Sequence, residues 1–363
     1  MESFVNNALK QAKEYGMGDV QVGVANIKVF GCGGGGSNTV TWLHKKGIQG
    51  AEVVALNTDK QHLEISSADY KVLIGKELTR GLGAGGFPEK GREAAKESLH
   101  DLKEVLKGSD MVFVCAGLGG GTGSGSAPVV AQLAREQGAI VIGTVTMPFD
   151  IERARVDKAE FALQQLREVS DTVIVIDNNR LTSIAGNLPI QQAFAVANEL
   201  ISTMIKGIVE TIAVPSLVNL DYADVKAIMS NGDVSVVGIG ESDTDSRVEE
   251  ATRRALTNPL LDVSYDGATG ALIHITGGDD LTLDEVNRAG ELITETLDPD
   301  ANVIMGARID PSMKGKIRIM SIITGVNSPY ILGRVDKKKF VNSGIKVSPD
   351  LGIDILTSTP RRF

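Results

Sequence analysis

The sequence predicts an α/β protein that begins with a parallel-sheet domain, continues through one long central helix and ends in a second, α+β domain. Three observations predict this order. Short apolar strands alternate with helices from residue 27 to residue 176, glycine gathers in three clusters within that alternation, and one helical pattern runs from 190 to 213. The corresponding segments are a helical extension at 1–25, a first domain at 26–189, the central helix at 190–213, a second domain at 214–328 and a tail at 329–363.

The first domain is expected to consist of βαβ units, in which right-handed crossovers make neighbouring strands parallel. Strands are predicted at 27–30, 53–56, 111–116, 140–146 and 172–176, and helices near 38–46 and at 88–106, 127–137 and 158–169. Sheets of this kind bind ligands beyond the carboxyl ends of their strands. All three glycine clusters and the tip at 57–59 fall in connections of this half, so a ligand is expected there.

The pattern at 190–213 is apolar nearly all round, with a few polar residues interspersed, which suits a helix buried between two domains. After Pro215, strands are predicted at 234–239, 270–275, 302–309 and 316–326, with helices at 246–256 and 282–297. These elements indicate a four-stranded sheet with helices. At the two ends of the chain, an amphipathic helix is expected at 2–15 and a surface tail at 329–363.

The composition is that of a globular protein, because 42% of the 363 residues are apolar and 23% are charged. Acidic residues outnumber basic ones by 46 to 37, and the resulting charge of −9 argues against broad nucleic-acid binding. The two cysteines, Cys32 and Cys115, provide no disulfide framework. Since there is no apolar run of about 18 residues and no signal-peptide pattern, we expect no direct membrane insertion and a cytoplasmic location.

The first glycine cluster, at 31–36, follows a strand and precedes a helix. Backbone N–H groups at such a helix start point toward an anion, and the helix dipole favours negative charge there. Gly31, Gly33 and Gly36 also satisfy G-x-G-x-x-G, and Asp59 ends the next strand region. A dinucleotide site in an NAD-dependent oxidoreductase therefore stays open as an alternative, and so does a turn that serves packing alone.

The second cluster, at 118–126, is more specific, because its spaced glycines, interspersed with hydroxyl residues, form a nest of backbone N–H donors that can wrap a di- or triphosphate. A helix is expected to start beyond it at Ala127 and Pro128, where proline is favoured. The third cluster, at 80–86, would cover the terminal phosphate or form a mobile surface loop. There is no Walker motif, and the histidines and cysteines lack metal-ligand spacing, so no protein metal ligands are predicted.

Two carboxylates, Asp221 and Asp224, precede a predicted helix and lie three residues apart, so they point the same way from its first turn. Helix capping alone explains them equally well. They follow the central helix and are far along the chain from the glycine clusters. If they act on a bound phosphate, that phosphate is expected to lie on a neighbouring molecule.

Six motifs in order connect the chain with a known family: FGCGGGGSNTV, ALNTD, TRGLGAGGFPEKG, GGGTGSG, VTMPF and NLDYADVKAIM. With them the chain resembles the tubulin/FtsZ superfamily from about residue 26 to residue 326, and within it the FtsZ family of cell-division GTPases. The resemblance implies a Rossmann-like GTPase domain, a central helix and an activation domain. It also implies GTP or GDP and Mg²⁺ as ligands, and head-to-tail protofilaments in which GTP lies between two subunits.

The resemblance further implies which residues contact the nucleotide. Glu152 matches the ribose contact, and Asn178 and Asn198 match positions that recognise guanine. Phe194 matches a ring stacked on the base, although packing in the helix core also explains it. The other candidates for nucleotide contact are Gly34, Gly35, Gly36, Ser37, Asn38, Asn57, Ala84, Gly85, Gly86, Gly120, Gly121, Thr122, Gly123, Ser124 and Arg155.

The chain departs from the family pattern at several positions. Val156 stands where the family usually has arginine, with Arg153 and Arg155 nearby, and Asp177 and Phe87 replace a usual proline and asparagine. In the tail, the segment GIDIL at 352–356 resembles tails that bind the membrane adaptor SepF.

Together these features predict GTP hydrolysis coupled to polymerisation at the division ring. Asn219, Asp221 and Asp224 match the family's loop that enters the neighbouring subunit's site, where the aspartates would orient or deprotonate the attacking water. The expected partners are other copies of the chain and a membrane adaptor, with no nucleic acid. Two alternatives stay open, the oxidoreductase built on 31–36 and Asp59, and a nucleotide-binding scaffold in which the aspartates only cap a helix.

Overall fold

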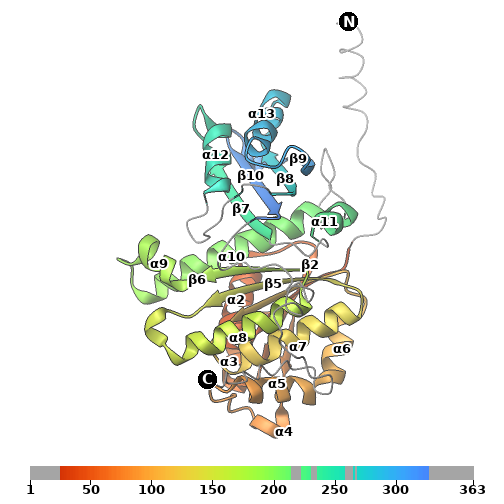
Figure 1. The fold of residues 1–363 in the computed structure, drawn as a ribbon, viewed down its shortest axis with the longest axis vertical. Helices are drawn as coiled ribbons and strands as arrows, with labels where there is room; N and C mark the ends of the chain where they lie inside the picture. Colours follow the sequence, from red (N-terminus) through yellow and green to blue (C-terminus); the bar gives the residue numbers. More distant parts are fainter. Residues whose placement is uncertain (1–24, 214–221, 230–234, 258–264, 266–267, 327–363) are drawn as a thin grey trace, which may run out of the picture.

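The computed structural model describes residues 25–213, 222–229, 235–257, 265 and 268–326. The expected helix at 2–15, the tail at 329–363 and the candidates Asn219 and Asp221 lie outside the described residues. In the described part, two sheets lie on either side of one long helix, α10 (Ile190–Ala213), as Figure 1 shows. None of the helices in that part is long and apolar enough to cross a membrane.

The first sheet has six strands in the order β3-β2-β1-β4-β5-β6, and all its pairings are parallel. Ile27 of β1 pairs with Ala51 of β2 on one side and with Met111 of β4 on the other. The strand order reverses between β1 and β4, and such a switch point is where open α/β sheets bind ligands. The strands are β1 (Ile27–Cys32), β2 (Ala51–Asn57), β3 (Tyr70–Leu73), β4 (Met111–Gly117), β5 (Ile140–Met147) and β6 (Thr172–Asp177).

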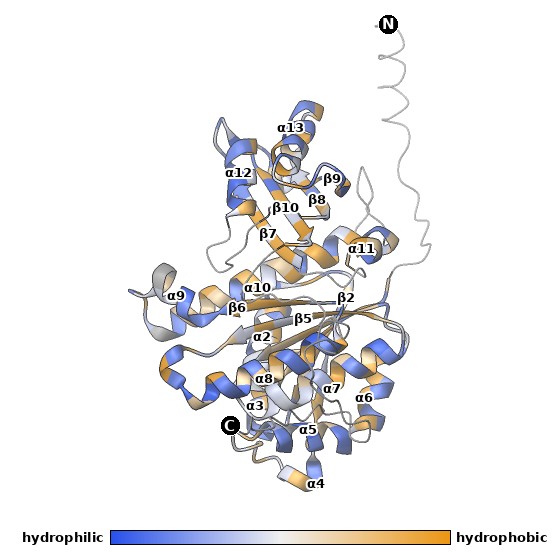
Figure 2. Ribbon diagram, in the orientation of Figure 1, coloured by the Kyte–Doolittle hydropathy of each residue, from blue (hydrophilic) through white to orange (hydrophobic). Residues whose placement is uncertain are grey.

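Helices cover both faces of this sheet, because successive strand residues point to opposite faces. On β1, Val29 packs into the core that contains α2 and α10, while Phe30 packs into the core formed with α5, α6, α7 and α8. The hydropathy colouring of Figure 2 shows apolar strands flanked by helices whose outer faces are polar. These helices are α2 (Gly33–Lys46), α3 (Lys60–Ile65), α4 (Lys76–Thr79), α5 (Pro88–Glu97), α6 (Leu99–Leu106), α7 (Thr122–Glu136), α8 (Ala154–Val169) and α9 (Asn178–Ala185), with the 3₁₀ turn η1 (Asp150–Glu152).

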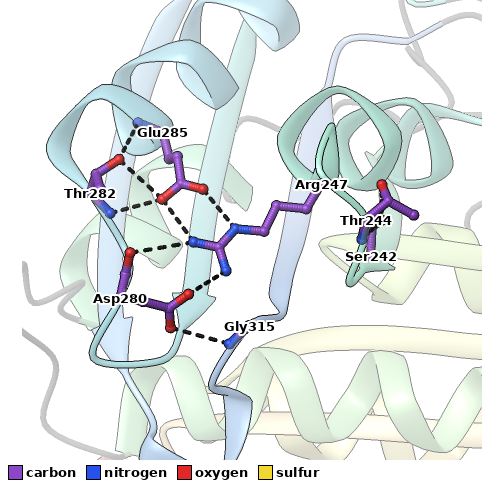
Figure 3. Close-up of polar contacts among 7 residues, drawn as sticks. All are labelled: Ser242, Thr244, Arg247, Asp280, Thr282, Glu285 and Gly315. Carbon is purple, nitrogen blue, oxygen red and sulfur yellow. Dashed lines mark hydrogen bonds and ion pairs between the residues drawn. The ribbon is translucent and has the colours of Figure 1, made fainter.

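The second sheet has four strands, as predicted, in the order β7-β10-β8-β9. β10 is antiparallel to β7 and β8, while β8 and β9 are parallel. One face packs against α12 and α13, which Arg247 joins through its contacts with Glu285 and Asp280 (Figure 3). The elements are α11 (Tyr222–Met229), β7 (Ser235–Ser242), α12 (Arg247–Leu256), β8 (Gly270–Gly277), α13 (Leu283–Thr294), β9 (Asn302–Ile309), the 3₁₀ turn η2 (Pro311–Met313) and β10 (Ile317–Thr324).

The central helix α10 has the bounds and the environment that its sequence predicts. Ile201, Ile205 and Ile208 are buried in one core cluster with Val29 of the first sheet and Met320 of the second. A helix that packs against a sheet on each side needs apolar residues around most of its circumference. One continuous core therefore runs from the first sheet through α10 to the second.

Two helices begin earlier than predicted. The helix expected near 38–46 begins at Gly33, and the one expected at 127–137 begins at Thr122, so glycines that look like loop residues form first helical turns. The prediction that Pro128 stands at a helix start is therefore wrong, since Pro128 lies inside α7. Its ring supplies no N–H to the carbonyl four residues earlier.

Other differences involve short elements. The helix expected at 88–106 is divided at Ser98, whose hydroxyl accepts a hydrogen bond of 3.2 Å from Gly75 N. The strand β3 and the helices α3, α4 and α9 are not predicted from the sequence, because four to eight residues are too few to establish a hydrophobic period.

Candidate functional site

The first and second glycine clusters touch backbone to backbone at the carboxyl edge of the first sheet. A Cβ atom on Gly33 would lie 2.5 Å from the backbone nitrogen of Gly123, and one on Gly36 would collide with the carbonyl oxygen of Cys115. No residue with a side chain fits at such distances. The glycines therefore let the loops after β1 and β4 approach each other closely.

The third cluster is held over the second. A Cβ atom on Gly121 would lie 2.9 Å from both Phe87 N and the Ala84 side chain. The loop is anchored to the end of β2, because Gly83 N donates to the carbonyl of Thr58 at 3.2 Å. The Thr58 and Thr122 hydroxyls are 2.6 Å apart, so the loops after β2 and β4 are also joined. Three segments far apart in sequence thus form one cradle.

The cradle has an open surface made largely of backbone. Gly34 and Gly86 are exposed, and nothing lies within 4 Å of a Cβ placed on either one. The helices α2 and α7 both begin here, so their first N–H groups and the positive ends of their dipoles lie at this edge. Two helix starts at one surface form a site suited to a polyanion such as a chain of phosphates.

Arg155 lies against this cradle. Its Nε is 3.4 Å from the carbonyl oxygen of Gly119, and its guanidinium is also paired with Glu152 one turn before it in the chain. A Cβ atom on Gly120 would lie 3.8 Å from the same guanidinium. Arg155 is therefore positioned to meet a ligand on the second glycine loop, while Val156 has no charge to offer.

Lys158 is a positioning residue that the sequence analysis did not single out. Its ammonium donates a hydrogen bond of 2.8 Å to the Gly86 carbonyl and lies 5.5 Å from the centre of the Phe87 ring. It thereby ties α8 to the third glycine loop. Three charged residues, Glu152, Arg155 and Lys158, follow one another at intervals of three, which is typical of one side of a helix. This spacing could have identified Lys158 from the sequence.

Aromatic and amide residues gather at one end of the cradle. The rings of Phe149 and Phe194 meet edge to face with centroids 6.2 Å apart, and Phe194 is 40% exposed. One turn further along α10, Asn198 Oδ1 accepts a hydrogen bond of 3.1 Å from Thr39 of α2. Asn178 begins α9 beside the end of β6 and is nearly buried. A half-exposed ring with amides near it suits a planar base.

Two reciprocal hydrogen bonds stabilise this end of the cradle. Asn179 Nδ2 donates to Asp150 Oδ1 at 2.9 Å, while Asp150 N donates to Asn179 Oδ1 at 3.0 Å. Asp177, which stands where the family usually has proline, caps α9 by accepting from Asn179 N. The segment that carries Glu152 is thus joined directly to the start of α9.

Several predicted contact residues have side chains that are not open to a ligand. Ser37 is fully buried, and its hydroxyl has no hydrogen-bond partner among the described residues. Ser124 is also buried and accepts from Gly119 N at 2.9 Å, which shapes the second loop. Asn57 is buried and accepts from Asp59 N. These side chains support the cradle, and Asn38, Gly35 and Gly85 are exposed at its surface.

Asp224 lies at the other edge of the sheet. It stands in the first turn of α11, and Tyr222 of the same helix donates a hydrogen bond of 2.7 Å to the carbonyl of Asp110, directly before β4. The glycine cradle follows the end of β4 at Gly117. Seven strand residues separate the two edges, about 20 Å at ~3.3 Å per residue. One chain therefore does not bring Asp224 to its own cradle.

Other chemistries find little support in the described residues. Asp59 accepts from His62 N at 3.1 Å and so caps α3. Within the described ranges, no three His, Cys, Asp or Glu side chains are grouped so as to hold a metal ion. Burial raises the pKa of the Cys32 thiol to about 12, which keeps it protonated.

Comparison with known proteins identifies the family. The model of the tubulin/FtsZ family, GTPase domain, matches residues 26–186, and the model of the FtsZ family, C-terminal domain, matches residues 233–327. The chain belongs to the FtsZ family. It carries the family's GTPase domain, so the oxidoreductase alternative is set aside, and guanine nucleotide is the ligand that this domain binds.

Relatives match over most of their lengths. "Cell division protein FtsZ 2" of Methanocaldococcus jannaschii is 61% identical over 322 residues, which cover 88% of this chain and 85% of that protein. The protein of the same name from Halobacterium salinarum is 53% identical over 319 residues, covering 88% and 81%.

Solved structures have the same fold. A structure described as an empty FtsZ dimer from M. jannaschii superposes with a TM-score of 0.79 at 49% identity, covering 88% of this chain and 92% of that one. GDP-bound CetZ1 from Haloferax volcanii superposes with a TM-score of 0.73 at 25% identity, covering 84% and 96%.

Proposed function

We propose that this FtsZ-family GTPase polymerises head to tail and hydrolyses GTP at sites shared by two subunits, in the ring that divides the cell. The single observation that carries the shared site is the position of Asp224 at the sheet edge opposite the glycine cradle. Stacking subunits along one direction would set one subunit's Asp224 edge against the next subunit's cradle. Asn219 and Asp221, on the segment just before α11, would enter with it.

Nucleotide binding follows from the chemistry of the cradle. The phosphates would lie on the N–H groups of the glycine loops and helix starts, with the Arg155 guanidinium beside Gly119 and Gly120. Glu152 would accept from the ribose hydroxyls. The half-exposed ring of Phe194 would stack on guanine, with Asn178 and Asn198 at its edge.

For hydrolysis, this chain's residues supply position and charge. A carboxylate of ordinary acidity is a weak base, so Asp221 and Asp224 would chiefly orient the attacking water against the terminal phosphate. Backbone N–H groups of the cradle would stabilise the charge that develops on the transferred phosphoryl group. Mg²⁺ bound with the nucleotide would neutralise phosphate charge.

The relatives support the assembly and the cellular role. Two are named cell division proteins, and one solved relative is described as a dimer. We infer that the chain acts in the cytoplasm at the division site, and that the tail segment 352–356 is the attachment point for a membrane adaptor of the SepF type. A pull-down of SepF by the whole chain, lost when 352–356 is deleted, tests the adaptor.

The experiment that tests the shared site is phosphate release from GTP, with Mg²⁺, over a range of protein concentrations. A site completed by a second subunit gives a rate per molecule that rises above a threshold, and sedimentation should detect polymer at the same threshold. A rate per molecule that stays flat would mean a self-contained GTPase and would overturn the shared site. Polymer without phosphate release would mean a nucleotide-binding scaffold.

A further inference from the structure

Three aspartates form the same pair of hydrogen bonds along the amino edge of the first sheet. Each stands directly before a strand and faces one residue of the neighbouring strand region. Its backbone N–H donates to the carbonyl of that residue, and its carboxylate accepts from the N–H of the same residue, all at distances from 2.7 to 2.9 Å. The pairs are Asp69 with Val53, Asp110 with Asn26 and Asp171 with Val141. Because hydrogen bonds to a carboxylate are among the stronger ones, this edge is held in one arrangement.

Asp110 connects the largest number of elements at this edge. Besides its two bonds to Asn26, its carbonyl accepts from Ile140 N at 2.8 Å and from the Tyr222 hydroxyl at 2.7 Å. Asp110 therefore joins the starts of β1, β4 and β5 to α11. Since β1 and β4 lead into the first and second glycine clusters at their other ends, α11 is attached to the same strands that carry the cradle.

The Tyr222 hydroxyl fixes the first turn of α11. Further along the helix, Val225, Ile228 and Met229 are buried in the core. Burial of apolar side chains is non-directional, whereas a hydrogen bond of 2.7 Å has a narrow geometry. The hydroxyl thus sets the rotation of the turn that carries Asp224. In Figure 1, α11 lies at the edge of the first sheet opposite α9, which follows the carboxyl end of β6.

The surroundings of the Tyr222 ring keep its hydroxyl a donor. Burial, with a smaller effect from the charges of Asp110 and Asp171, raises the pKa of Tyr222, so the phenol is protonated at neutral pH. A carbonyl oxygen can only accept, and the protonated phenol matches it. Lys226, one turn later, places its ammonium 5.8 Å from the centre of the ring.

We propose that Tyr222 is a positioning residue for GTP hydrolysis, whose hydroxyl, bound to the Asp110 carbonyl, sets the position from which Asp224 meets the nucleotide of the neighbouring subunit. This role rests on the shared site proposed above. The Tyr222 hydroxyl is occupied by Asp110, so it acts through Asp224 and not on the nucleotide. Displacements of about 1 Å can lower the rate of a positioned reaction up to about 100-fold. A small rotation of α11 should therefore lower turnover and leave nucleotide binding unchanged.

Tyr222→Phe tests this role in the full chain, because it removes the hydroxyl and keeps the ring. We expect phosphate release per polymerised subunit to fall about tenfold. The affinity for GTP, measured below the assembly threshold, and the threshold itself, measured by sedimentation, should each stay within about twofold of the parent's values. A separation of turnover from binding and assembly is not expected of a residue that only stabilises the fold.

Tyr265→Phe is the matched control. Tyr265 also donates a hydrogen bond of 2.7 Å to a backbone carbonyl, that of Leu256 at the end of α12, within the second domain. Both variants should lose a similar amount of stability in denaturant unfolding, since each loses one such bond. Only Tyr222→Phe should lose turnover. Lys226→Gln, which removes the cation beside the ring and keeps the hydroxyl, should turn over GTP as the parent does.

Three results would overturn the role of Tyr222. Tyr222→Phe could release phosphate as fast as the parent at the same amount of polymer, or Tyr265→Phe could lose as much turnover. A raised threshold with normal turnover per polymerised subunit would make Tyr222 an assembly residue instead. Failure of the shared site itself is distinguishable from all three, because the parent's own rate per molecule would then stay flat as its concentration rises.

Discussion

Tyr222 donates a hydrogen bond of 2.7 Å to the backbone carbonyl of Asp110, and this contact holds α11 beside the amino edge of β4. The glycine cradle follows the carboxyl end of the same strand. Because a β-strand is rigid and extended, the two edges cannot approach each other within one chain. The geometry therefore separates the glycine cradle from Asp224 within one chain, as the proposed shared site requires.

Asp224→Ala is expected to keep GTP binding and assembly but to lower turnover about 100-fold, because the water would lose a group that orients it. Phosphate release measures turnover and sedimentation measures assembly, both at the same protein concentrations. Asp101→Ala is a suitable control, since Asp101 also stands in the first turn of a surface helix. If the two variants lose turnover equally, the effect belongs to helix ends in general and not to the shared site.

Gly121→Ala should destabilise the cradle, because the new Cβ would lie 2.9 Å from Phe87 N and from the Ala84 side chain. We expect a loss of about 1–3 kcal/mol in the free energy of unfolding, together with weaker GTP binding. Gly117→Ala, at the end of β4 just before this loop, is the matched control, because its Cβ would meet only ordinary contacts at 3.4 and 3.5 Å. Denaturant unfolding and nucleotide titration distinguish the two.

Arg155→Gln is expected to weaken GTP binding about tenfold, or roughly 1.4 kcal/mol, because a charge beside the second glycine loop is lost. Arg153→Gln removes the same charge two residues away, where the side chain is exposed and no hydrogen bond or ion pair of it is seen within the described residues. A fluorescent GTP analogue would measure both affinities. Equal weakening in the two variants would mean that only the overall charge matters and that Arg155 makes no specific contact.

Arg247 is expected to stabilise the second domain in a pH-dependent way (Figure 3). Its guanidinium holds the pKa of Glu285 and that of Asp280 below their usual ranges. Carboxylates with lowered pKa values stabilise the fold above their unfolded pKa, about 4, and lose that contribution as the pH falls through the folded value. Arg247→Gln should therefore reduce stability by about 1–3 kcal/mol at pH 7 and by less at pH 3.

The control for that charge network is Arg288→Gln, an arginine on α13 whose side chain is 45% exposed. Chemical denaturation of both variants at pH 7 and pH 3 makes the comparison. An Arg247→Gln effect as large at pH 3 as at pH 7 would show that packing of the arginine side chain, and not its charge, holds α12 to α13.

His274 should make stability fall between neutral and acidic pH. Its pKa of about 4 in the folded chain lies below the ordinary value of 6.5, so the unfolded chain binds the proton more readily. Stability is then fully present above pH 6.5 and is lost down to about pH 4, by roughly 3 kcal/mol at about 1.36 kcal/mol per pKa unit. His274→Leu should remove this slope in urea unfolding measured from pH 7 to pH 4. An unchanged slope would mean that other groups titrate in that range.

Most elements were predictable from the sequence because their patterns are local. Buried strands such as β4 are short apolar runs in the sequence, and α10 is a long segment with a helical pattern. The starts of α2 and α7 were not predictable, because glycine disfavours the helix and here its conformation is imposed by contacts between loops. The position of Arg155 against Gly119 also depends on how α8 packs, and no local sequence pattern predicts that packing.

The sequence by itself determined the family, the order of elements and which loops are rich enough in glycine to carry a nucleotide, since these depend on residue types along the chain. Only the tertiary structure decided which residues meet. It joined Thr58 to Thr122, put Lys158 on the Gly86 carbonyl, and set Asp224 at the far edge of the sheet. It also left Nε2 of the buried His274 without a hydrogen-bond partner among the described residues. The reason is physical: such contacts depend on strand register and on the packing of helices between two sheets, and both are properties of the whole core.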